Sequence, residues 1–173
     1  MAAMTKEAVA EARRVETFED FFHANYERLL RAMYLATGNR HEAEDLAQDA
    51  MARVLERWDR VGATEDPVGY VYRVALNRRR SLLRRVAVAV RKAPGAQPDS
   101  ASEPMAAVEE RDAIRRALAD LPTSQREALI LCDWLGMTDV QAAMTLKTSA
   151  GAVRTRLHRA RGAMRTALGG PDA

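Results

Sequence analysis

Residues 138–161 read TDVQAAMTLKTSAGAVRTRLHRAR, and this stretch decides the fold of the C-terminal half of the chain. Thr138, with Gln141 three residues later, forms a capping box and predicts a short helix that ends near Leu146. After a two-residue connection, Ser149 is a typical N-cap residue and predicts a longer helix. A short helix, a tight turn and a basic helix together form a helix-turn-helix pattern.

The longer helix is expected to have a core side and a DNA-reading side. At about 100° per residue its apolar residues fall on one seam, namely Val153, Leu157, Ala160, Met164 and Leu168. The other positions carry small, polar and basic side chains that could meet base edges and phosphates. The alternative is a surface helix that its arginines merely keep soluble.

Basic residues gather in two blocks. Residues 1–76 hold ten basic and fourteen acidic side chains, a net charge of −4. Residues 77–92 hold seven basic and no acidic side chains, and residues 151–165 hold five arginines and no acid. The overall charge of +3 is too small to identify a partner. Two acid-free blocks on separate segments nevertheless favour a polyanion as the ligand.

The composition excludes several classes of protein. With 173 residues, 47% of them hydrophobic and 29% charged, the chain suits one or two small soluble domains and not a fibrous or disordered protein. The one cysteine, Cys132, cannot form an intramolecular disulfide. No apolar run fits a signal peptide or approaches the roughly 20 residues that span a bilayer. We therefore expect a cytoplasmic location without membrane insertion.

The chain is expected to be all-α, with two small helical domains joined by a flexible linker. No segment alternates polar and apolar residues as a half-buried strand does. The segment 93–105 has three prolines and too few large apolar residues to order itself. The expected divisions are an N-terminal extension (1–17), a first domain (18–92), the linker (93–105), a helix-turn-helix domain (106–168) and a tail (169–173).

Three helices are expected in the first domain. Apolar residues at helical spacing predict a helix from about residue 18 that ends at Gly38. Asn39 and Glu42 form a candidate capping box for a second helix, which runs to about Trp58. The pair Asp66-Pro67 predicts an N-cap and first turn for a third helix through the basic block.

Two further helices precede the helix-turn-helix pattern. Apolar residues between Val108 and Leu121 mark a helix that ends before Pro122. Ser124 and Glu127 form a second candidate capping box, which predicts a helix that closes at Gly136.

Both halves resemble one family, in the expected order: the extracytoplasmic-function (ECF) sigma factors of bacterial RNA polymerase. The resemblance covers about residues 18–168. The matching strings in the second half are LPTSQRE (121–127), GMT (136–138) and GAVRTRLHRAR (151–161). In the first half, AEDLAQD (43–49) resembles the family's polymerase-clamp motif and YVYRVALN (70–77) resembles its promoter-melting helix.

The resemblance implies a promoter-specific transcription initiation factor that is not an enzyme and needs no cofactor or metal. It implies that the chain binds core RNA polymerase, recognises the −35 and −10 promoter elements and assists melting. An anti-sigma factor is a further candidate partner. The implied polymerase-binding residues are Asp45, Leu46, Gln48 and Asp49. The implied −10 and melting residues are Tyr70, Asn77, Arg78, Arg79, Arg80, Arg84 and Arg85, with the loop at about 60–66. The implied −35 residues are Ser149, Gly151, Arg154, Thr155, His158, Arg159 and Arg161.

Spacing supports part of this assignment. Asp45, Gln48 and Asp49 lie at i, i+3 and i+4, so one helix face can present them to basic side chains of a partner. Of Tyr70 and Tyr72, one is expected to face DNA and the other to pack in the bundle.

The chain also departs from the family pattern. Tyr70 stands where a tryptophan is usual, and Ser81 where an aspartate is often found. Val140-Gln141 replaces a common acidic pair, and Lys147 replaces the customary glycine of the turn. The last two changes bear on the geometry of the turn.

Two other functions remain as alternatives. The stretch HEAED (41–45) offers metal-binding side chains, but it lacks the second histidine, four residues after the first, of a His-Glu-x-x-His zinc helix. The other alternative is a helix-turn-helix DNA-binding regulator that does not bind polymerase. A pull-down with core polymerase distinguishes the three functions.

Overall fold

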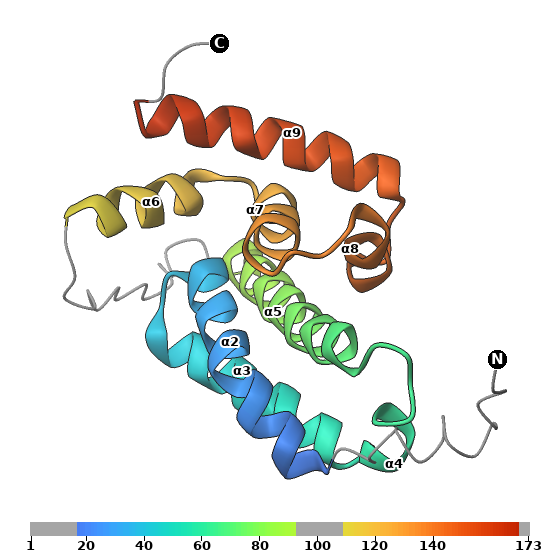
Figure 1. Ribbon diagram of the computed structural model, residues 1–173. Coiled ribbons are helices and arrows are strands. Elements are labelled where there is room, and N and C mark those ends of the chain that lie inside the picture. The colour runs from blue at the N-terminus through green and yellow to red at the C-terminus, as the bar shows by residue number, and fades with distance from the viewer. Residues whose placement is uncertain (1–16, 93–108, 170–173) are drawn as a thin grey trace, which may run out of the picture.

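The computed structural model describes residues 17–92 and 109–169, and they form an all-α fold (Figure 1). The first half of the fold contains α2 (Phe18–Thr37), α3 (Arg40–Leu55), the short α4 (Trp58–Val61) and α5 (Pro67–Lys92). The second half contains α6 (Glu109–Asp120), α7 (Thr123–Leu129), a π-helical segment η1 (Ile130–Trp134), α8 (Asp139–Leu146) and α9 (Ala150–Ala167). None of the helices in these two ranges is long and apolar enough to cross a membrane.

Most of the predicted start and stop signals of the first half are confirmed, but Asn39 caps its helix without the reciprocal bond from the Glu42 side chain that a capping box needs. Gly38 ends α2 at φ 71°, and the Asn39 side chain accepts a hydrogen bond from the backbone N–H of Glu42 at 3.0 Å. The predicted end of the second helix at Trp58 is wrong, since α3 ends at Leu55. Trp58 is the first residue of α4, and its ring packs against the ring of Phe21 at a centroid distance of 5.0 Å. The chain therefore leaves the axis of α3 after Leu55 and starts a separate short helix at Trp58.

The start of α5 follows its sequence signal. The Asp66 carboxylate accepts a hydrogen bond from the backbone N–H of Gly69 at 2.7 Å, and Pro67 occupies the first helical position. A side chain at Gly69 would collide with this carboxylate, because an added Cβ would lie 2.0 Å from Asp66 Oδ2. The cap and the glycine therefore fix where the long basic helix begins.

The second predicted capping box is wrong. The cap residue of α7 is Pro122, which makes no side-chain cap bond, and Ser124 lies inside the helix. Glu127 is only 1% exposed, because it forms ion pairs with the first half of the chain. The helix then widens into η1, and Gly136 at φ 72° ends it, as predicted.

The helix-turn-helix pattern is present as α8 and α9. Thr138 and Gln141 cap each other reciprocally, and Ser149 accepts from the N–H of Ala152 at 3.1 Å. Lys147 adopts the left-handed conformation, with φ 53°, in which the family's glycine would be unstrained. The predicted core seam of α9 is buried from Val153 to Ala160 and partly buried at Met164, but Leu168 lies past the helix end and is 43% exposed.

One hydrophobic core connects the two halves. Its cluster joins side chains of α2, α3 and α5, such as Leu29 and Leu76, with side chains of η1 and α8, such as Leu131 and Leu146. In Figure 1, α7 and α8 lie over α5. The sequence left the packing of the halves open, and here they are closed against each other. The predicted linker lies largely outside the described residues, so the division into domains stays a prediction.

Candidate nucleic-acid interface

A surface hollow of about 400 Å³ lies between α3 and α5. Four of the predicted −10 residues line it: Tyr70, Asn77, Arg78 and Arg85. The remaining lining residues are Arg53, Arg57, Val74 and Ser81. Sequence reasoning missed Arg53, which follows Asp49 by one helical turn on α3, and Arg57, which lies in the turn between α3 and α4.

The side chains of the hollow suit a nucleotide. Arg57, in the turn after α3, donates to the hydroxyl of Tyr70 on α5 at 3.4 Å. The hollow thus combines an aromatic ring, an amide and several guanidinium groups, which match the base and the phosphate of a strand. Tyr72 is the tyrosine that packs in the core, since it is 1% exposed and its burial raises its pKa to about 12.

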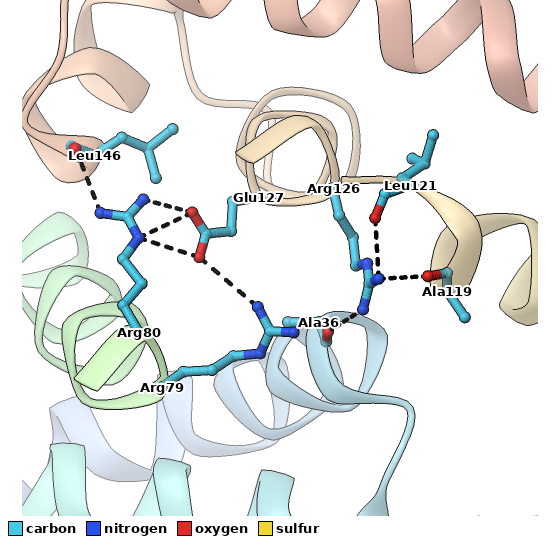
Figure 2. A network of polar contacts seen from close by, with 8 residues as sticks. All are labelled: Ala36, Arg79, Arg80, Ala119, Leu121, Arg126, Glu127 and Leu146. Atoms are coloured by element: carbon cyan, nitrogen blue, oxygen red, sulfur yellow. Dashed lines mark hydrogen bonds and ion pairs between the residues drawn. The ribbon is translucent and has the colours of Figure 1, made fainter. Parts of the chain in front are cut away.

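Two of the predicted −10 residues face away from this hollow. Arg79 is 4% exposed and Arg80 is half-buried, and both point toward Glu127 of α7 (Figure 2). Arg80 Nε donates to both carboxylate oxygens of Glu127, at 3.2 and 3.1 Å, and Nη2 adds a further short contact. Arg79 Nη1 lies 3.8 Å from Glu127 Oε1. In this arrangement Arg79 and Arg80 are therefore not available to DNA, whereas Arg84 is exposed on α5.

Arg126 extends this junction. It donates to the carbonyl oxygen of Ala36 on α2 at 2.7 Å, and to those of Ala119 and Leu121 at 2.6 and 3.0 Å (Figure 2). Burial lowers the pKa of both Arg79 and Arg126. Each guanidinium is also affected by its charged neighbours, and Arg79 acts to lower the pKa of Arg126 while Glu127 acts to raise it. Positive charge is thus crowded where the halves meet.

The predicted polymerase-binding motif lies on α3. Asp45 and Gln48 are exposed, and Asp49 is half-buried. Asp49 pairs with Arg53 Nε through Oδ1 at 3.3 Å and with Arg78 Nε through Oδ2 at 3.2 Å. It therefore contacts two of the arginines that line the hollow without lining the hollow itself. Leu46 is 1% exposed in the core. The expectation that it contacts polymerase does not fit this arrangement, because an apolar side chain at that position of α3 packs inward.

The predicted −35 residues of α9 and its cap share one exposed surface: Ser149, Gly151, Arg154, Thr155, His158, Arg159 and Arg161. Two of the arginines are paired within the second half. Arg161 forms a bidentate pair with Asp133 of η1 at 3.0 and 2.6 Å, and these hydrogen bonds raise the pKa of Arg161. Arg154 lies 3.6 Å from Asp139. The sequence showed no sign of the Arg161 pair, because its partner lies 28 residues away.

The metal-enzyme alternative finds no support in the part of the chain that the structure describes. There, no three histidine, cysteine, aspartate or glutamate side chains gather closely enough to hold a metal ion. His41 is exposed in the first turn of α3.

Comparison with known proteins identifies the family. Residues 21–88 match the family described as Sigma-70 region 2, and residues 111–164 match Sigma-70, region 4. The RNA polymerase sigma-E factor of Streptomyces coelicolor is 32% identical over 156 residues, which cover 87% of this chain and 85% of the relative. The chain is an ECF sigma factor of the sigma-70 family. A second relative, the ECF RNA polymerase sigma factor SigM of Mycobacterium tuberculosis H37Rv, is 29% identical, with coverages of 88% and 77%.

Solved structures share the fold of this sigma factor. The sigma factor RpoE of Bartonella quintana, in complex with the anti-sigma factor NepR, superposes with a TM-score of 0.75 at 24% identity, covering 88% of this chain and 96% of the other. CnrH, in complex with the cytosolic domain of CnrY, gives a TM-score of 0.62 at 21% identity, with 94% of each chain covered.

Membership of the family defines the general function. The sigma factor is a promoter-specific transcription initiation factor that binds core RNA polymerase and promoter DNA. The alternative of a helix-turn-helix regulator that never binds polymerase is not favoured, because residues 21–88, most of the first half of the fold, match region 2.

Proposed function

We propose that this sigma factor works through three surfaces whose residues are divided as the structure groups them. The exposed face of α3, with Asp45, Gln48 and Asp49, binds core polymerase, and Leu46 supports that face from the core. The hollow between α3 and α5 receives the −10 strand. The exposed face of α9 reads the −35 element.

The hollow carries this proposal. An unpaired base must exchange its partner and its stacking neighbours for protein contacts. Tyr70 offers a ring for stacking, which is worth about 1–3 kcal/mol per base, and Asn77 offers an amide that both donates and accepts. Arg53, Arg57, Arg78 and Arg85 surround them and match the phosphates on either side.

The −35 surface works by direct contact with a major groove. The exposed residues between Ser149 and Arg159 lie on the outer side of α9. The residues of the core seam in this stretch, Val153 and Leu157, are buried on the other side, so they do not interrupt the exposed surface. Thr155 donates to the carbonyl oxygen of Gly151 at 3.0 Å, which fixes its rotamer on this face. Base contacts then specify the sequence, and the flanking arginines contact phosphates.

We further propose a cytoplasmic location, no catalytic activity and an anti-sigma partner. The location follows the position of the polymerase and the DNA. No step of promoter recognition or base capture needs a covalent reaction by the sigma factor. The partner is suggested by RpoE of Bartonella quintana, a protein of the same fold that was solved with an anti-sigma factor.

Asn77→Ala tests the role of the hollow. The variant should keep core binding and closed-complex formation, and it should lower the yield of open complexes on duplex promoters, because the flipped base loses its amide contacts. Permanganate footprinting of the −10 thymines measures melting. A template with a preformed mismatch bubble should recover much of the lost transcription, since unpairing is no longer required.

Asn25→Ala is the matched control, because it removes an amide from α2, where Asn25 donates to the carbonyl oxygen of Phe21 at 2.8 Å. It should leave melting unchanged. Wild-type thymine reactivity in Asn77→Ala on duplex DNA would contradict the assignment of the hollow.

A further inference from the structure

The junction between the halves contains an imbalance of charge. Arg79, Arg80 and Arg126 converge there, and Glu127 is the carboxylate that the first two contact (Figure 2). Glu42, half-buried on α3, adds a weaker attraction to Arg79. Because the Glu127 side chain is 1% exposed, water screens these interactions little.

The two arginines that contact Glu127 are satisfied to different degrees. Arg80 has a well-formed fork of hydrogen bonds to the carboxylate, and its Nη1 also lies 3.5 Å from the carbonyl oxygen of Leu146 on α8. Arg79 has buried Nε and Nη1 atoms without a hydrogen-bond partner among the described residues. A buried cation with incomplete hydrogen bonding opposes the arrangement that buries it. The closed state is therefore held by the shared core and by Arg80, and it is weakened by Arg79.

Arg79 and Arg80 directly follow, in the sequence, two residues that line the hollow between α3 and α5. Asn77 and Arg78 line the hollow, and Arg79 and Arg80 follow directly on the same helix. A guanidinium binds a carboxylate and a phosphate in the same planar, two-pronged way. Glu127 thus presents to Arg80 the type of ligand that a DNA backbone would present.

In the closed arrangement, α5 and α9 cannot contact the −10 and −35 elements at the same time. The −35 and −10 elements are about 85 Å apart, at 3.4 Å for each of about 25 base pairs. Here α8 packs against both α5 and α9. The halves must separate before α5 and α9 can each reach its element.

We propose that Glu127 is an internal competitor for the DNA backbone. In the free sigma factor its carboxylate occupies Arg80 and faces Arg79, and when the halves separate both arginines become available to the phosphates of the −10 strand. The inference rests on the proposed role of α5 in −10 binding. Because only the opened fraction can offer Arg79 and Arg80 to phosphates, the apparent affinity of the free chain for the strand is lower than that of an opened chain.

Glu127→Gln tests the competition in the full-length sigma factor without polymerase. The probe is a fluorescein-labelled single-stranded 20-mer of random sequence, and the measurement is fluorescence anisotropy. We expect the variant to bind about tenfold more tightly than wild type, within the usual range of coupling between sites. Small-angle X-ray scattering should show a larger radius of gyration for the variant alone. In the Arg79→Ala/Arg80→Ala background, the same substitution should give no gain in affinity.

Glu19→Gln is the charge-matched control, because it removes the same charge from an exposed position on α2. A gain as large in Glu19→Gln as in Glu127→Gln would attribute the effect to net charge and overturn the proposal. An unchanged affinity in a folded Glu127→Gln variant would also overturn it.

If Glu127→Gln does not fold, wild type still provides a test: its radius of gyration should increase as the 20-mer saturates it. Binding of the oligonucleotide to a chain that stays compact would contradict the competition. Promoter-specific initiation with core polymerase separates the two proposals. Initiation that depends on Asn77, together with a failed competition test, leaves the proposed function standing and removes this inference alone.

Discussion

Asp49 joins two functions that the sequence kept apart. The resemblance of residues 43–49 to the polymerase-clamp motif predicts that Asp49 binds polymerase, and its shared helix face with Asp45 and Gln48 supports this prediction. In the structure its carboxylate also holds Arg53 and Arg78, which line the strand hollow. Its Oδ2 atom is buried against Arg78, so Oδ1 is the atom that remains nearer the surface. One side chain thus connects the proposed polymerase-binding face with the proposed DNA-binding face.

Asp49→Arg should weaken holoenzyme formation by about tenfold or more, because it reverses a charge opposite a basic partner and repels both arginines. Asp49→Asn should have a smaller effect, since it keeps the size and the hydrogen-bond acceptor. Fluorescence titration of core polymerase with labelled sigma factor measures the affinity. Equal core affinity for wild type and Asp49→Arg would remove Asp49 from the polymerase surface.

Arg161 and Arg159 differ in their surroundings, and their substitutions should differ accordingly. Arg161→Ala should weaken binding to all sequences and reduce the salt slope by about one unit. Arg159→Ala should change the preference within the −35 element. Binding-site selection at two salt concentrations measures both effects, and a uniform loss in both variants would contradict the division. Asp133→Asn tests the pair directly, because it should free Arg161 and increase the salt dependence.

What the sequence predicts well is what short stretches determine. The caps at Asn39, Thr138 and Ser149, and the buried side of α9, depend on neighbours three or four residues away. The errors concern residues whose partners are distant in the sequence. Glu127 looked like a capping residue, and its ion pair with Arg80 spans 47 residues. Leu46 matched a motif, but packing of α3 against α2 and α5 decides that its side chain is buried.

The turn between α8 and α9 depends on the backbone conformation of one residue, Lys147. Lys147 ends α8 in a left-handed conformation, and its N–H donates to the carbonyl oxygen of Ala143. A residue with a Cβ is strained there, at a cost of roughly 1–2 kcal/mol. The turn keeps the family's geometry without the family's glycine.

Lys147→Gly should therefore raise the thermal unfolding midpoint by a few degrees, because relief of strain exceeds the added entropy of the unfolded chain. Lys147→Val should lower the midpoint, since a β-branched residue tolerates this conformation least. Calorimetry measures both. A lower midpoint for Lys147→Gly would show that the lysine side chain, and not its backbone, stabilises the turn.

The π-helical segment η1 is a second local departure from regular α-helix geometry. In it, the N–H of Leu135 donates to the carbonyl oxygen of Ile130, five residues earlier, at 3.0 Å. The wider turn buries Ile130 and Leu131 and leaves Trp134 48% exposed. Apolar periodicity alone could not reveal it, because the pattern before and after is helical.

The closed molecule is held together at several places besides Glu127. Arg28 of α2 donates to the carbonyl oxygen of Leu135 at 2.9 Å, and Arg115 of α6 donates to the Tyr34 hydroxyl at 3.0 Å. A hollow of about 220 Å³ borders Tyr72 near this junction. The two described parts of the chain therefore pack against each other, a point that the sequence left open.

The alkaline limit of stability should depend on Tyr72. Its pKa is about 12 in the folded chain, above the ordinary 10.0, because burial disfavours the phenolate. The folded chain holds this proton more tightly than the unfolded chain does. The contribution is fully present below pH 10 and is lost as pH rises toward 12, by about 2–3 kcal/mol at 1.36 kcal/mol per unit.

Tyr72→Phe should flatten this decrease in denaturant titrations between pH 10 and 12. At pH 7 it should change the free energy of unfolding by less than about 1 kcal/mol, since the hydroxyl has no hydrogen-bond partner among the described residues. An equally steep alkaline decrease in Tyr72→Phe would assign the loss to other groups.

The shared core gives the sigma factor a limited lifetime once it opens. Separation turns apolar side chains of α5 and α8 outward, and surfaces of this kind attract other chains and proteases. We expect polymerase and promoter DNA to cover these side chains during initiation, whereas an opened chain released from the complex would leave them exposed. We expect such a chain either to close again or to be lost to aggregation and degradation, so that rapid closing of the released halves would preserve active factor.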